Sequence, residues 1–535
     1  MSRKSFARLV CLLLTLIVVV GLLCACNKQE QALTDLPTTT DNYRTYYQIF
    51  PYAFADSNGD GIGDIQGIID HLDYIESLNF DGIWLTPVHK STSYHKYDVV
   101  DYETIDSQFG TMEDYDKLVE ECHKRGMSVL LDLVINHTSS KHWWFDECLT
   151  AHRRGLVNDQ YYNYFNVEQT SKPRNGWYSA GGGLAYEAQF WSEMPDINWQ
   201  EVLDHPTGYL ANDLKEIMRF WLIDHKVDGF RLDAVSQYFT GNPTKNKKAL
   251  TWINETAKSI KEDCYIVGEG PWDATAYSYY ESGADSFFLF NHGFTGGGSI
   301  SMAARSENVE WFTDIDKNNK ARIGDLIPAM FVANHDTARA YGILQGGVDI
   351  NNMKLGYGVM AMCEGATFWY YGDEIGMNAF NNAAGDSIDE NKRQPMPWGD
   401  SYTCNPVKGT TSVEDNVKYP LGDVPTNLND ANSLVNYIAR ANALRRAFPQ
   451  IARNYGEVVY KSSDDFVGLI RKGEGEDAVY IAVNVSHDLE IPLDLAQFGN
   501  FTIVGTLSVD VKNMPTLSKS MLTLPPMSFA VLQKV

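Results

Sequence analysis

The chain has 535 residues and carries 69 Asp and Glu residues against 44 Lys and Arg residues, a formal net charge of −25 at pH 7. A chain this acidic would repel phosphate backbones, so we expect no nucleic-acid partner. Hydrophobic residues make up 44% and aromatic residues 12% of the chain, enough for a large core with accessory domains, as in a globular enzyme. The five cysteines beyond residue 26 are odd in number and widely spaced, so neither a disulfide framework nor a zinc site is expected.

The first 25 residues are predicted to be a lipoprotein signal peptide. Three basic residues precede an apolar stretch at 9–23 that is short for a membrane span, and the following Leu-Cys-Ala-Cys at 23–26 is typical of a lipobox. Processing would leave Cys26 as the lipid-bearing first residue, followed by a flexible tether over 26–42. We therefore expect the mature chain outside the cytoplasm, anchored to a bacterial cell membrane through this lipid only. A plain cleaved signal and an uncleaved anchor are the alternatives.

An acidic loop, DSNGDGIGD at 56–64, has the ligand spacing of a calcium-binding loop. Its positions 1, 3, 5 and 9 carry side-chain oxygens, and position 7 can offer a backbone carbonyl. An all-oxygen ligand set favours Ca²⁺ over transition metals. A true EF-hand would have Glu at position 12, where this chain has Gly67, so we expect a structural Ca²⁺ site on a different fold, with a plain acidic turn as the alternative. The expected ligands are Asp56, Asn58, Asp60, Ile62 and Asp64.

Short apolar stretches alternate with helical patterns along most of the chain. Eight strands separated by helices predict an α/β fold, a (β/α)₈ TIM barrel formed by 43–137 and 206–450. The strands are expected near 46–50, 81–86, 128–135, 227–233, 265–269, 286–290, 329–333 and 366–371. The helices include 65–78, 112–125, 211–225 and 251–262.

Two segments break this alternation. Residues 138–205 are predicted to be an inserted lid after the third strand, and 13 of these 68 residues are aromatic. Because sugar rings stack on aromatic faces, such a lid suits a carbohydrate, although we expect most of the rings to form the core of the insertion itself. The alternating patterns from 451 to 535 predict a C-terminal all-β sandwich.

Three carboxylates, Asp233, Glu269 and Asp336, each follow one of the predicted strands. A single acid at a strand end is often only solvated. Three of them, each beside another polar residue, are expected to converge in one cleft, because the carboxyl ends of barrel strands meet at one face. Such a trio can cleave a glycosidic bond: one carboxylate attacks, a second protonates the leaving oxygen, and a third stabilises the cationic transition state.

Four short motifs carry a resemblance to a known family: DLVINH at 132–137, GFRLDA at 229–234, VGE at 267–269 and ANHD at 333–336. With them the chain resembles the α-amylase family, glycoside hydrolase family 13, from about Tyr43 to its end. The resemblance implies that Asp233 is the nucleophile, Glu269 the general acid/base and Asp336 the transition-state stabiliser. It also implies that the loop at 56–64 is a calcium loop like that of the oligo-1,6-glucosidase-like members.

The same resemblance implies a set of sugar-binding residues. Tyr97 in YHKYD would stack beneath the sugar at the cleavage point, and Arg231, two residues before Asp233, would keep the nucleophile ionised. For Asn136 the sequence leaves two alternatives: it orients the lid, or it binds a second calcium ion. The expected substrate-binding residues are Tyr97, Asp98, His137, Arg231, His335, Asp389 and Arg393.

Substrate preference is less well defined by the sequence. MPDIN at 194–198 lies between the oligo-1,6-glucosidase form QPDLN and the neopullulanase form MPKLN, and Ala234 after the nucleophile favours α-1,4 over α-1,6 cleavage. Lys96 stands where the family usually has glycine, and Ser236-Gln237 replaces a Lys-His pair, which affects the leaving-group subsites. We expect a monomeric retaining hydrolase of α-1,4 bonds in starch or maltodextrins. The alternatives are a neopullulanase- or α-glucosidase-type enzyme, a 4-α-glucanotransferase and, more remotely, an inactive glucan-binding lipoprotein.

Overall fold

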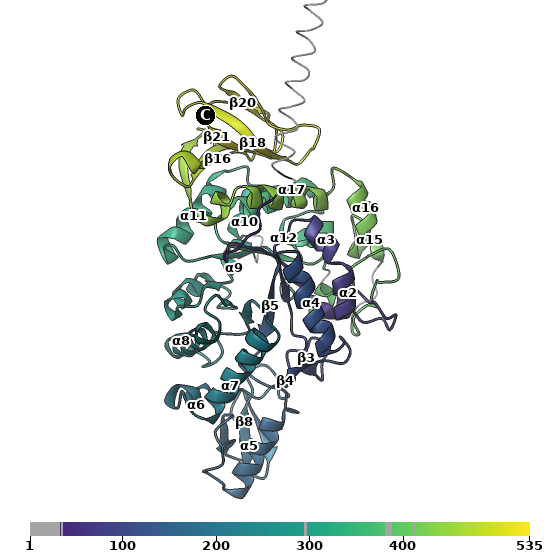
Figure 1. Cartoon of the computed structure of the whole chain (residues 1–535), viewed down its shortest axis with the longest axis vertical. Helices are drawn as coiled ribbons and strands as arrows, with labels where there is room; N and C mark the ends of the chain where they lie inside the picture. The colour runs from purple at the N-terminus through teal and green to yellow at the C-terminus, as the bar shows by residue number, and fades with distance from the viewer. Residues whose placement is uncertain (1–32, 34–35, 294–296, 380–387, 411–413) are drawn as a thin grey trace, which may run out of the picture.

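The computed structural model describes residues 33, 36–293, 297–379, 388–410 and 414–535. The predicted signal peptide, Cys26 and most of the predicted tether lie outside this part. Figure 1 shows three regions along the long axis: the C-terminal sheets at the top, the barrel in the middle, and the insertion with α5 and β8 at the bottom. Among the described helices, none has the length and apolar character needed to cross a membrane.

Eight parallel strands form the barrel, as the sequence predicted. Each strand pairs with the next in parallel, and a single parallel bridge between Phe288 and Ala329 links the two ends of the sheet. Several strands are shorter than predicted, because the last residues of the predicted ranges belong to the loops that follow the strands. In order around the barrel they are β11 (Ser286–Phe287), β10 (Tyr265–Gly268), β9 (Gly229–Leu232), β5 (Ser128–Leu133), β2 (Gly82–Leu85), β1 (Thr45–Ile49), β13 (Ala366–Tyr370) and β12 (Ala329–Phe331).

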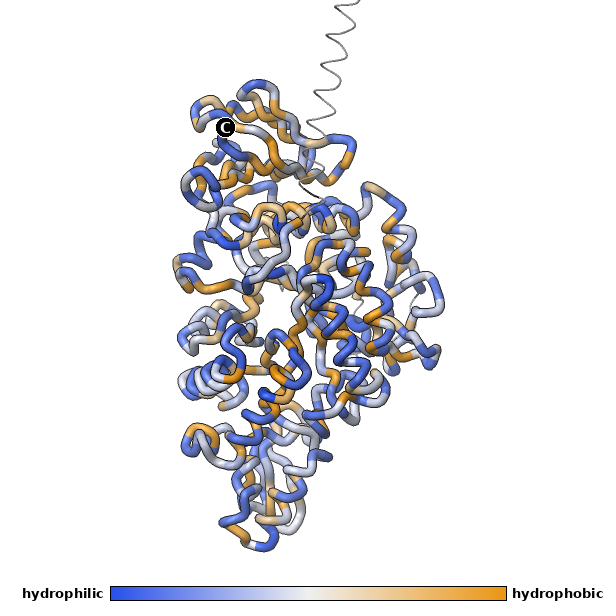
Figure 2. The backbone as a smooth tube through the Cα atoms, viewed as in Figure 1, coloured by the Kyte–Doolittle hydropathy of each residue, from blue (hydrophilic) through white to orange (hydrophobic). Residues whose placement is uncertain are grey.

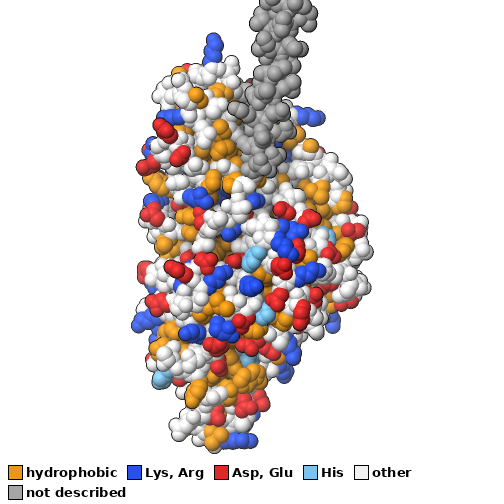
Figure 3. Space-filling view, viewed as in Figure 1, with side chains coloured by type: hydrophobic (Ala, Val, Ile, Leu, Met, Phe, Trp, Pro, Cys, Tyr) orange, Lys and Arg blue, Asp and Glu red, His pale blue; other side chains and the backbone are white. Residues whose placement is uncertain are grey.

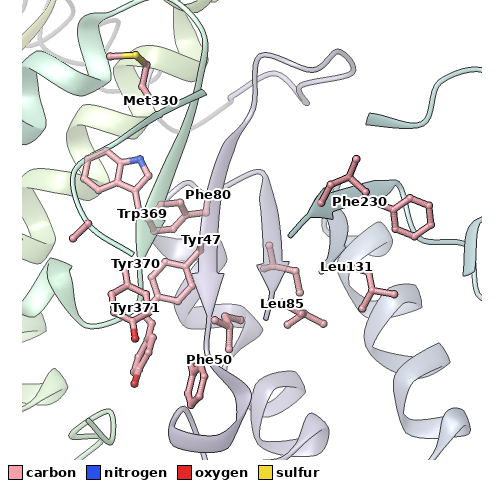
Figure 4. Packing of buried hydrophobic residues seen from close by; sticks show 14 of the residues in the cluster. Tyr47, Phe50, Phe80, Leu85, Leu131, Phe230, Met330, Trp369, Tyr370 and Tyr371 are labelled. Atoms are coloured by element: carbon pink, nitrogen blue, oxygen red, sulfur yellow. The ribbon is translucent and has the colours of Figure 1, made fainter. Parts of the chain in front are cut away.

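Aromatic side chains fill the inside of the barrel. Tyr46 on β1 stacks on Tyr265 of β10 and on Phe368 of β13, with ring centroids 5.9 and 4.8 Å apart. Since side chains alternate across a strand, the neighbouring residues face outward to the helices. Figure 4 shows this outer layer, where Tyr47 lies beside Phe80 and Leu131 lies near Phe230. The barrel is therefore a packed core, and an active site can form only at one of its ends.

Helices surround this sheet and bury their apolar faces on it. Helix α4 (Met112–Lys124) begins with a capping box between Thr111 and Asp114, and it buries Tyr115, Leu118, Val119 and Cys122, which are three or four residues apart. The other main helices are α2 (Ile65–Asp70), α3 (Leu72–Ser77), α7 (Tyr209–Arg219), α8 (Pro243–Ile260), α10 (Ser299–Arg305), α11 (Glu310–Ile323), α13 (Ile350–Met362), α16 (Val424–Asn429) and α17 (Leu434–Ala447). In Figure 2 the apolar segments gather in the sheets, and polar residues occupy the outer loops.

The insertion after β5 forms a small lid. Helix α5 (Trp143–Arg154) packs beside an antiparallel sheet of β6 (Val167–Gln169), β8 (Leu184–Glu187) and β7 (Trp177–Gly181), and α6 (Trp199–Asp204) leads back to the barrel. Six of its 13 rings are buried, fewer than the sequence led us to expect, namely Trp144, Phe145, Tyr164, Phe165, Tyr186 and Trp199. Four large aromatic side chains are exposed, namely Trp143, Tyr178, Phe190 and Trp191. The amide of Ile197 donates to the carbonyl of Asn136, which holds the end of the lid to the end of β5.

The C-terminal region consists of two antiparallel sheets beside the barrel. A buried ion pair between Lys472 on β15 and Asp316 on α11 links the two parts, together with Lys354, whose ammonium donates to the carbonyls of Asn432 and Val509. The larger sheet contains β14 (Gly456–Lys461), β15 (Val467–Lys472), β16 (Val479–Asn484), β21 (Ser528–Lys534) and β18 (Phe501–Ser508). The smaller one contains β17 (Ile491–Asp494), β20 (Met521–Leu524) and β19 (Thr516–Ser518).

Residues 37–41, which the sequence assigned to a flexible tether, contact the barrel. Arg446 at the end of α17 donates to the carbonyl of Pro37 at 2.7 Å, and Arg453 of α18 (Gln450–Arg453) forms an ion pair with Asp41 at 2.6 Å. The tether prediction is wrong for these residues, because their partners lie about 400 positions away and leave no local pattern. A free tether can therefore extend no further than residue 36.

Candidate active site

The three predicted acids lie at the carboxyl ends of barrel strands and line one cavity. Asp233 directly follows β9, Glu269 directly follows β10, and Asp336 lies five residues after the end of β12. The cavity has a volume of about 1260 Å³ and is bounded by the barrel, the lid and the segment that carries Asp389. Sequence and structure thus place the three carboxylates at one site.

One guanidinium connects the acids. Arg231, fully buried on β9, donates through Nη1 to Asp233 Oδ1 at 2.7 Å and to both oxygens of Asp132 at 2.8 and 2.9 Å. Its Nη2 donates to Glu269 Oε2 at 2.7 Å. One positive charge thus faces three carboxyl groups in a desolvated site, so they cannot all be ionised at little cost.

The protons of this cluster are held at Asp132 and Glu269. Burial, partly offset by Arg231, raises the pKa of Asp132 to about 7. Burial likewise raises the pKa of Glu269 to about 8, opposed by Arg231 and reinforced by the charges of Asp233 and Asp336. A Glu that keeps its proton at neutral pH is suited to general acid catalysis.

Asp336 has the opposite environment. Although burial alone would raise its pKa, the neighbouring His335 and Arg393 lower the pKa of Asp336 below the usual range. Its oxygens lie 3.0 Å from His335 Nε2 and 2.9 Å from Arg393 Nη2. Asp336 is therefore ionised where Glu269 is protonated, which suits a residue that stabilises a cationic transition state.

Tyr97 and His137 line one wall of the cavity, and His335 lies buried behind Tyr97. The rings of Tyr97 and His335 are nearly parallel, with centroids 5.5 Å apart and planes 4° apart. The Tyr97 hydroxyl lies 2.9 Å from Asp132 Oδ2 and 2.6 Å from His335 Nε2. Burial lowers the pKa of His137, which lines the cavity and can hydrogen-bond a sugar hydroxyl. His335 was predicted to contact the substrate as well, but it is fully buried and does not line the cavity. Its ring nitrogens contact Gln48, Tyr97 and Asp336, so it positions the last two side chains.

The backbone accounts for one of the sequence departures at this site. Lys96, where the family usually has glycine, adopts a left-handed conformation with φ of 63°, which glycine adopts without strain. The buried Lys96 ammonium donates to Asp106 at 2.9 Å and to Gln108 at 2.6 Å, which holds the strained loop and offsets its cost. Ala234, directly after Asp233, is also left-handed, with φ of 48°.

Asp98 does not lie where the resemblance implied. Its side chain is buried beneath the loop and accepts hydrogen bonds from the hydroxyls of Ser91, Thr92 and Ser93. It is not among the residues that line the cavity, so its role is to hold the loop that carries Tyr97. Arg231 was also predicted to bind the substrate, but it is fully buried and does not line the cavity, so it acts through the carboxylates and not on the sugar. Asp389 and Arg393 both line the cavity, and the Arg393 guanidinium lies 3.7 Å from Asp389 Oδ2.

Sequence reasoning missed four residues of the site. Asp132 was visible as a charge inside an apolar strand, but the sequence did not suggest that it would share Arg231 with the catalytic acids. Trp272 donates its indole N–H to Glu269 Oε1 at 3.1 Å. Phe190 and Trp191 of the lid are exposed and line the cavity, whereas the other lid rings pack within the lid or face away from it.

The predicted calcium loop is held by its own hydrogen bonds. The Asp56 carboxylate accepts from the amides of Asn58, Gly59 and Gly61, and Asp64 accepts from Ser57 and caps α2 through Gly67. In the described part of the chain, no group of three or more His, Cys, Asp or Glu side chains is arranged to hold a metal ion. The set of oxygen donors, which includes an amide and a carbonyl, still fits Ca²⁺ in its chemistry.

Comparisons with known proteins agree with this geometry. Residues 48–454 match the family model for the alpha amylase catalytic domain. The chain belongs to the alpha-amylase family. It is 36% identical to Alpha-amylase 3 of Dictyoglomus thermophilum over 364 residues, which are 66% of this chain and 67% of that protein. It is 28% identical to an oligo-1,6-glucosidase of Parageobacillus thermoglucosidasius, over 82% of this chain and 89% of that protein.

Solved structures of this family have the same fold. Amy13B of Eubacterium rectale superposes with a TM-score of 0.84 at 33% identity, over 95% of this chain and 99% of that one. The alpha-amylase from H. orenii has a TM-score of 0.75 at 30% identity, over 92% of this chain and 100% of that one. The alpha-amylase family member described here is therefore a glycoside hydrolase with a TIM barrel and a C-terminal all-β region.

The pH dependence of kcat/KM tests the protonation of Glu269. Because Glu269 has to carry its proton to act as the acid and its pKa is about 8, activity should persist through neutral pH and fall as the pH rises through about 8. Glu269→Gln should lower kcat about 10²–10⁴-fold and remove this basic limb. A wild-type profile that already falls between about pH 5 and 6 would contradict the assignment.

Proposed function

We propose that the protein is a retaining α-glucan hydrolase that cleaves α-1,4 bonds of starch-like polymers or maltodextrins by double displacement. The observation that carries this proposal is the double contact of Arg231 with Asp233 and Glu269. One guanidinium touching both groups favours the short carboxyl separation, about 5–5.5 Å, that is typical of retaining enzymes. It also places a positive charge beside the nucleophile, while burial keeps the acid Glu269 protonated.

The reaction would proceed in two steps. Asp233 Oδ attacks the anomeric carbon while Glu269 transfers its proton to the glycosidic oxygen, and the C–O bond breaks with its electron pair on the leaving sugar. Asp336 faces the positive charge that develops on the sugar ring. Glu269, now a carboxylate, then removes a proton from water, which attacks the anomeric carbon and releases Asp233.

The shape and lining of the cavity support a glucan substrate. Tyr97 lies at the base, exposed rings of Phe190, Trp191 and Trp272 line the walls, and Arg393 and Asp389 offer polar contacts. Flat rings beside charged hydrogen-bonding groups match the apolar faces and hydroxyl rims of glucose units. Ala234 after the nucleophile supports α-1,4 cleavage. The relatives named oligo-1,6-glucosidase keep a neopullulanase- or α-glucosidase-type trimming enzyme as the second candidate.

Product analysis tests this function. Maltoheptaose and amylose should yield α-anomeric products, detected by ¹H NMR before mutarotation, and pullulan should be cut slowly or not at all. Asp233→Asn should lower kcat at least about 10⁴-fold, since an amide cannot form the glycosyl ester, while its melting temperature stays near that of the wild type. β-Anomeric products, or cleavage confined to α-1,6 bonds, would contradict the proposal.

We further propose that the loop at 56–64 binds one structural Ca²⁺ through Asp56, Asn58, Asp60, the carbonyl of Ile62 and Asp64. Support comes from the five oxygens at EF-hand-like spacing and from the left-handed turn at Gly61, with φ of 90°. The ion would offset the mutual repulsion of three aspartates. It would act on the stability of the loop that precedes α2 and not on the chemistry.

Removal of calcium tests this site by stability. EDTA should lower the melting temperature by several degrees, and added Ca²⁺, but not Mg²⁺, should restore it. Asp60→Ala should have the lower melting temperature without EDTA and should no longer respond to either ion. Asp101→Ala, at a half-buried strand position outside the loop, is the matched control and should respond to EDTA and Ca²⁺ like the wild type. A wild-type melting temperature that is indifferent to EDTA and Ca²⁺ would disprove the site.

We also propose that the enzyme acts outside the cytoplasm as a monomer held to the cell membrane by a lipid on Cys26. Residues 37–41 are bound near the end of α17, which adjoins the C-terminal sheets, whereas the lid lies at the opposite end of the molecule in Figure 1. An anchor that ends at residue 36 would turn the cavity away from the bilayer and toward soluble glucans. On the face shown in Figure 3, acidic and basic side chains are interspersed, which supports a monomer.

Cell fractionation tests the anchor. The wild-type chain should remain in the membrane fraction, and Cys26→Ser should release the activity into the soluble extracytoplasmic fraction. Cys24→Ser, which leaves the predicted lipid-bearing residue in place, is the matched control and should stay with the membrane. Retention of the Cys26→Ser variant in the membrane fraction would contradict a lipid anchor at this residue.

A further inference from the structure

Trp272 lies between the barrel core and the cavity. The residue is in the loop that connects β10 to the 3-10 segment Ala274–Ser282, three positions after Glu269. Its ring stacks on Phe290, with centroids 4.9 Å apart and planes 14° apart, and Phe290 is only 1% exposed. Trp272 itself is 44% exposed and lines the cavity. One face of the indole is therefore fixed by the core, and the rest of the ring faces the ligand space.

The backbone on both sides of Trp272 is fixed as well. The side chain of Asp273 accepts a hydrogen bond from the amide of Thr275 at 2.8 Å and so caps the following 3-10 segment. Pro271 restricts the backbone on the other side of Trp272. Phe290 in turn packs edge-on against Phe331 of β12, with centroids 4.8 Å apart. The position of the indole N–H is thus set by the barrel core and not by the substrate.

This N–H determines how the Glu269 carboxyl is oriented. Glu269 Oε2 accepts from Arg231 Nη2 at 2.7 Å and from the amide of Ala234 at 3.2 Å. Glu269 Oε1 accepts from Trp272 Nε1 at 3.1 Å. The two oxygens therefore differ. Oε2 faces the buried guanidinium of Arg231, and Oε1 lies beside the indole of Trp272, which lines the cavity. An indole N–H can only donate, so it favours the ionised carboxyl group over the protonated one.

We propose that Trp272 is a positioning residue for the acid/base Glu269 and that its exposed ring forms the wall of the subsite for the leaving sugar. This inference rests on the proposed function. Because Oε1 is the oxygen directed toward the cavity, its proton is the one transferred to the glycosidic oxygen. The Glu269 O–H bond breaks as the leaving oxygen takes the proton, and the indole N–H stabilises the carboxylate that forms. The leaving sugar must lie next to Oε1, and hence next to the indole ring.

Two substitutions separate the N–H from the ring. Trp272→Phe keeps an aromatic ring on Phe290 but loses the donor. Its kcat should fall about tenfold, and the basic limb of its kcat/KM profile should move upward by about one pH unit, because the ionised Glu269 loses a hydrogen bond. With a 4-nitrophenyl maltoside, whose leaving group needs little protonation, the loss in the first step should be smaller. Trp272→Ala should show the same pH shift and, in addition, a raised KM for maltotetraose relative to the nitrophenyl substrate.

A control variant and two different contradicting results complete this test. Trp311→Phe, on the partly exposed helix α11 far from the cavity, should have wild-type kinetics and pH profile. Melting temperatures near that of the wild type establish that both Trp272 variants are folded. A Trp272→Phe enzyme with wild-type kcat and an unmoved basic limb would overturn the role of Trp272 while leaving the proposed function intact. Failure of the wild-type enzyme to cleave any α-glucan would overturn the proposed function itself.

Discussion

The contact of one buried guanidinium with three carboxyl groups is the constraint on which this site depends. Arg231 holds Asp132, Asp233 and Glu269 within hydrogen-bonding distance. The side chains of Arg231 and Asp132 are fully buried, and those of Asp233 and Glu269 are only 11% and 12% exposed. Without the positive charge, the carboxyl groups would repel one another or take up protons; without the carboxyl groups, the guanidinium would be a buried unpaired charge. Burial raises the pKa of Glu269 to about 8, so this acid keeps its proton at neutral pH, and the guanidinium lies directly beside the nucleophile Asp233. This division of roles comes from the environment, since the side chains themselves have similar chemistry.

The barrel supplies this arrangement through its geometry. Arg231 and Asp233 are two residues apart at the end of β9 and so point to the same side, and the parallel neighbours β5 and β10 bring Asp132 and Glu269 to the same level. The aromatic interior below them excludes water, which strengthens every charge interaction above it. Asp336, on the other side of the cavity, has its own counterion in Arg393. Burial and the neighbouring carboxylates thus keep Glu269 protonated, while His335 and Arg393 keep Asp336 ionised in the same cavity.

The sequence predicted those features that have a local signal. Eight apolar strands and the acids that end them were visible, because a β-strand and a following polar residue leave a short pattern. Most of what was missed depends on partners distant in the chain: the stacking of Trp272 on Phe290, the pairing of Asp41 with Arg453, and the sharing of Arg231 by Asp132. Asp98 lies next to Tyr97 in sequence, yet three hydroxyl groups turn it away from the cavity. Lys96 shows the reverse case, in which a residue unusual for the family is accommodated because Asp106 and Gln108 hold its side chain.

The most direct test of this account is to trap the covalent intermediate. In Glu269→Gln, α-maltosyl fluoride can react without an acid, because fluoride leaves unaided, while the missing base slows release of the sugar by water. Mass spectrometry of the digested protein should find a maltosyl group on the peptide that contains Asp233, and no label in Asp233→Asn. A label on another carboxylate, or turnover of the fluoride with inverted configuration and no intermediate, would contradict the division of roles set by Arg231.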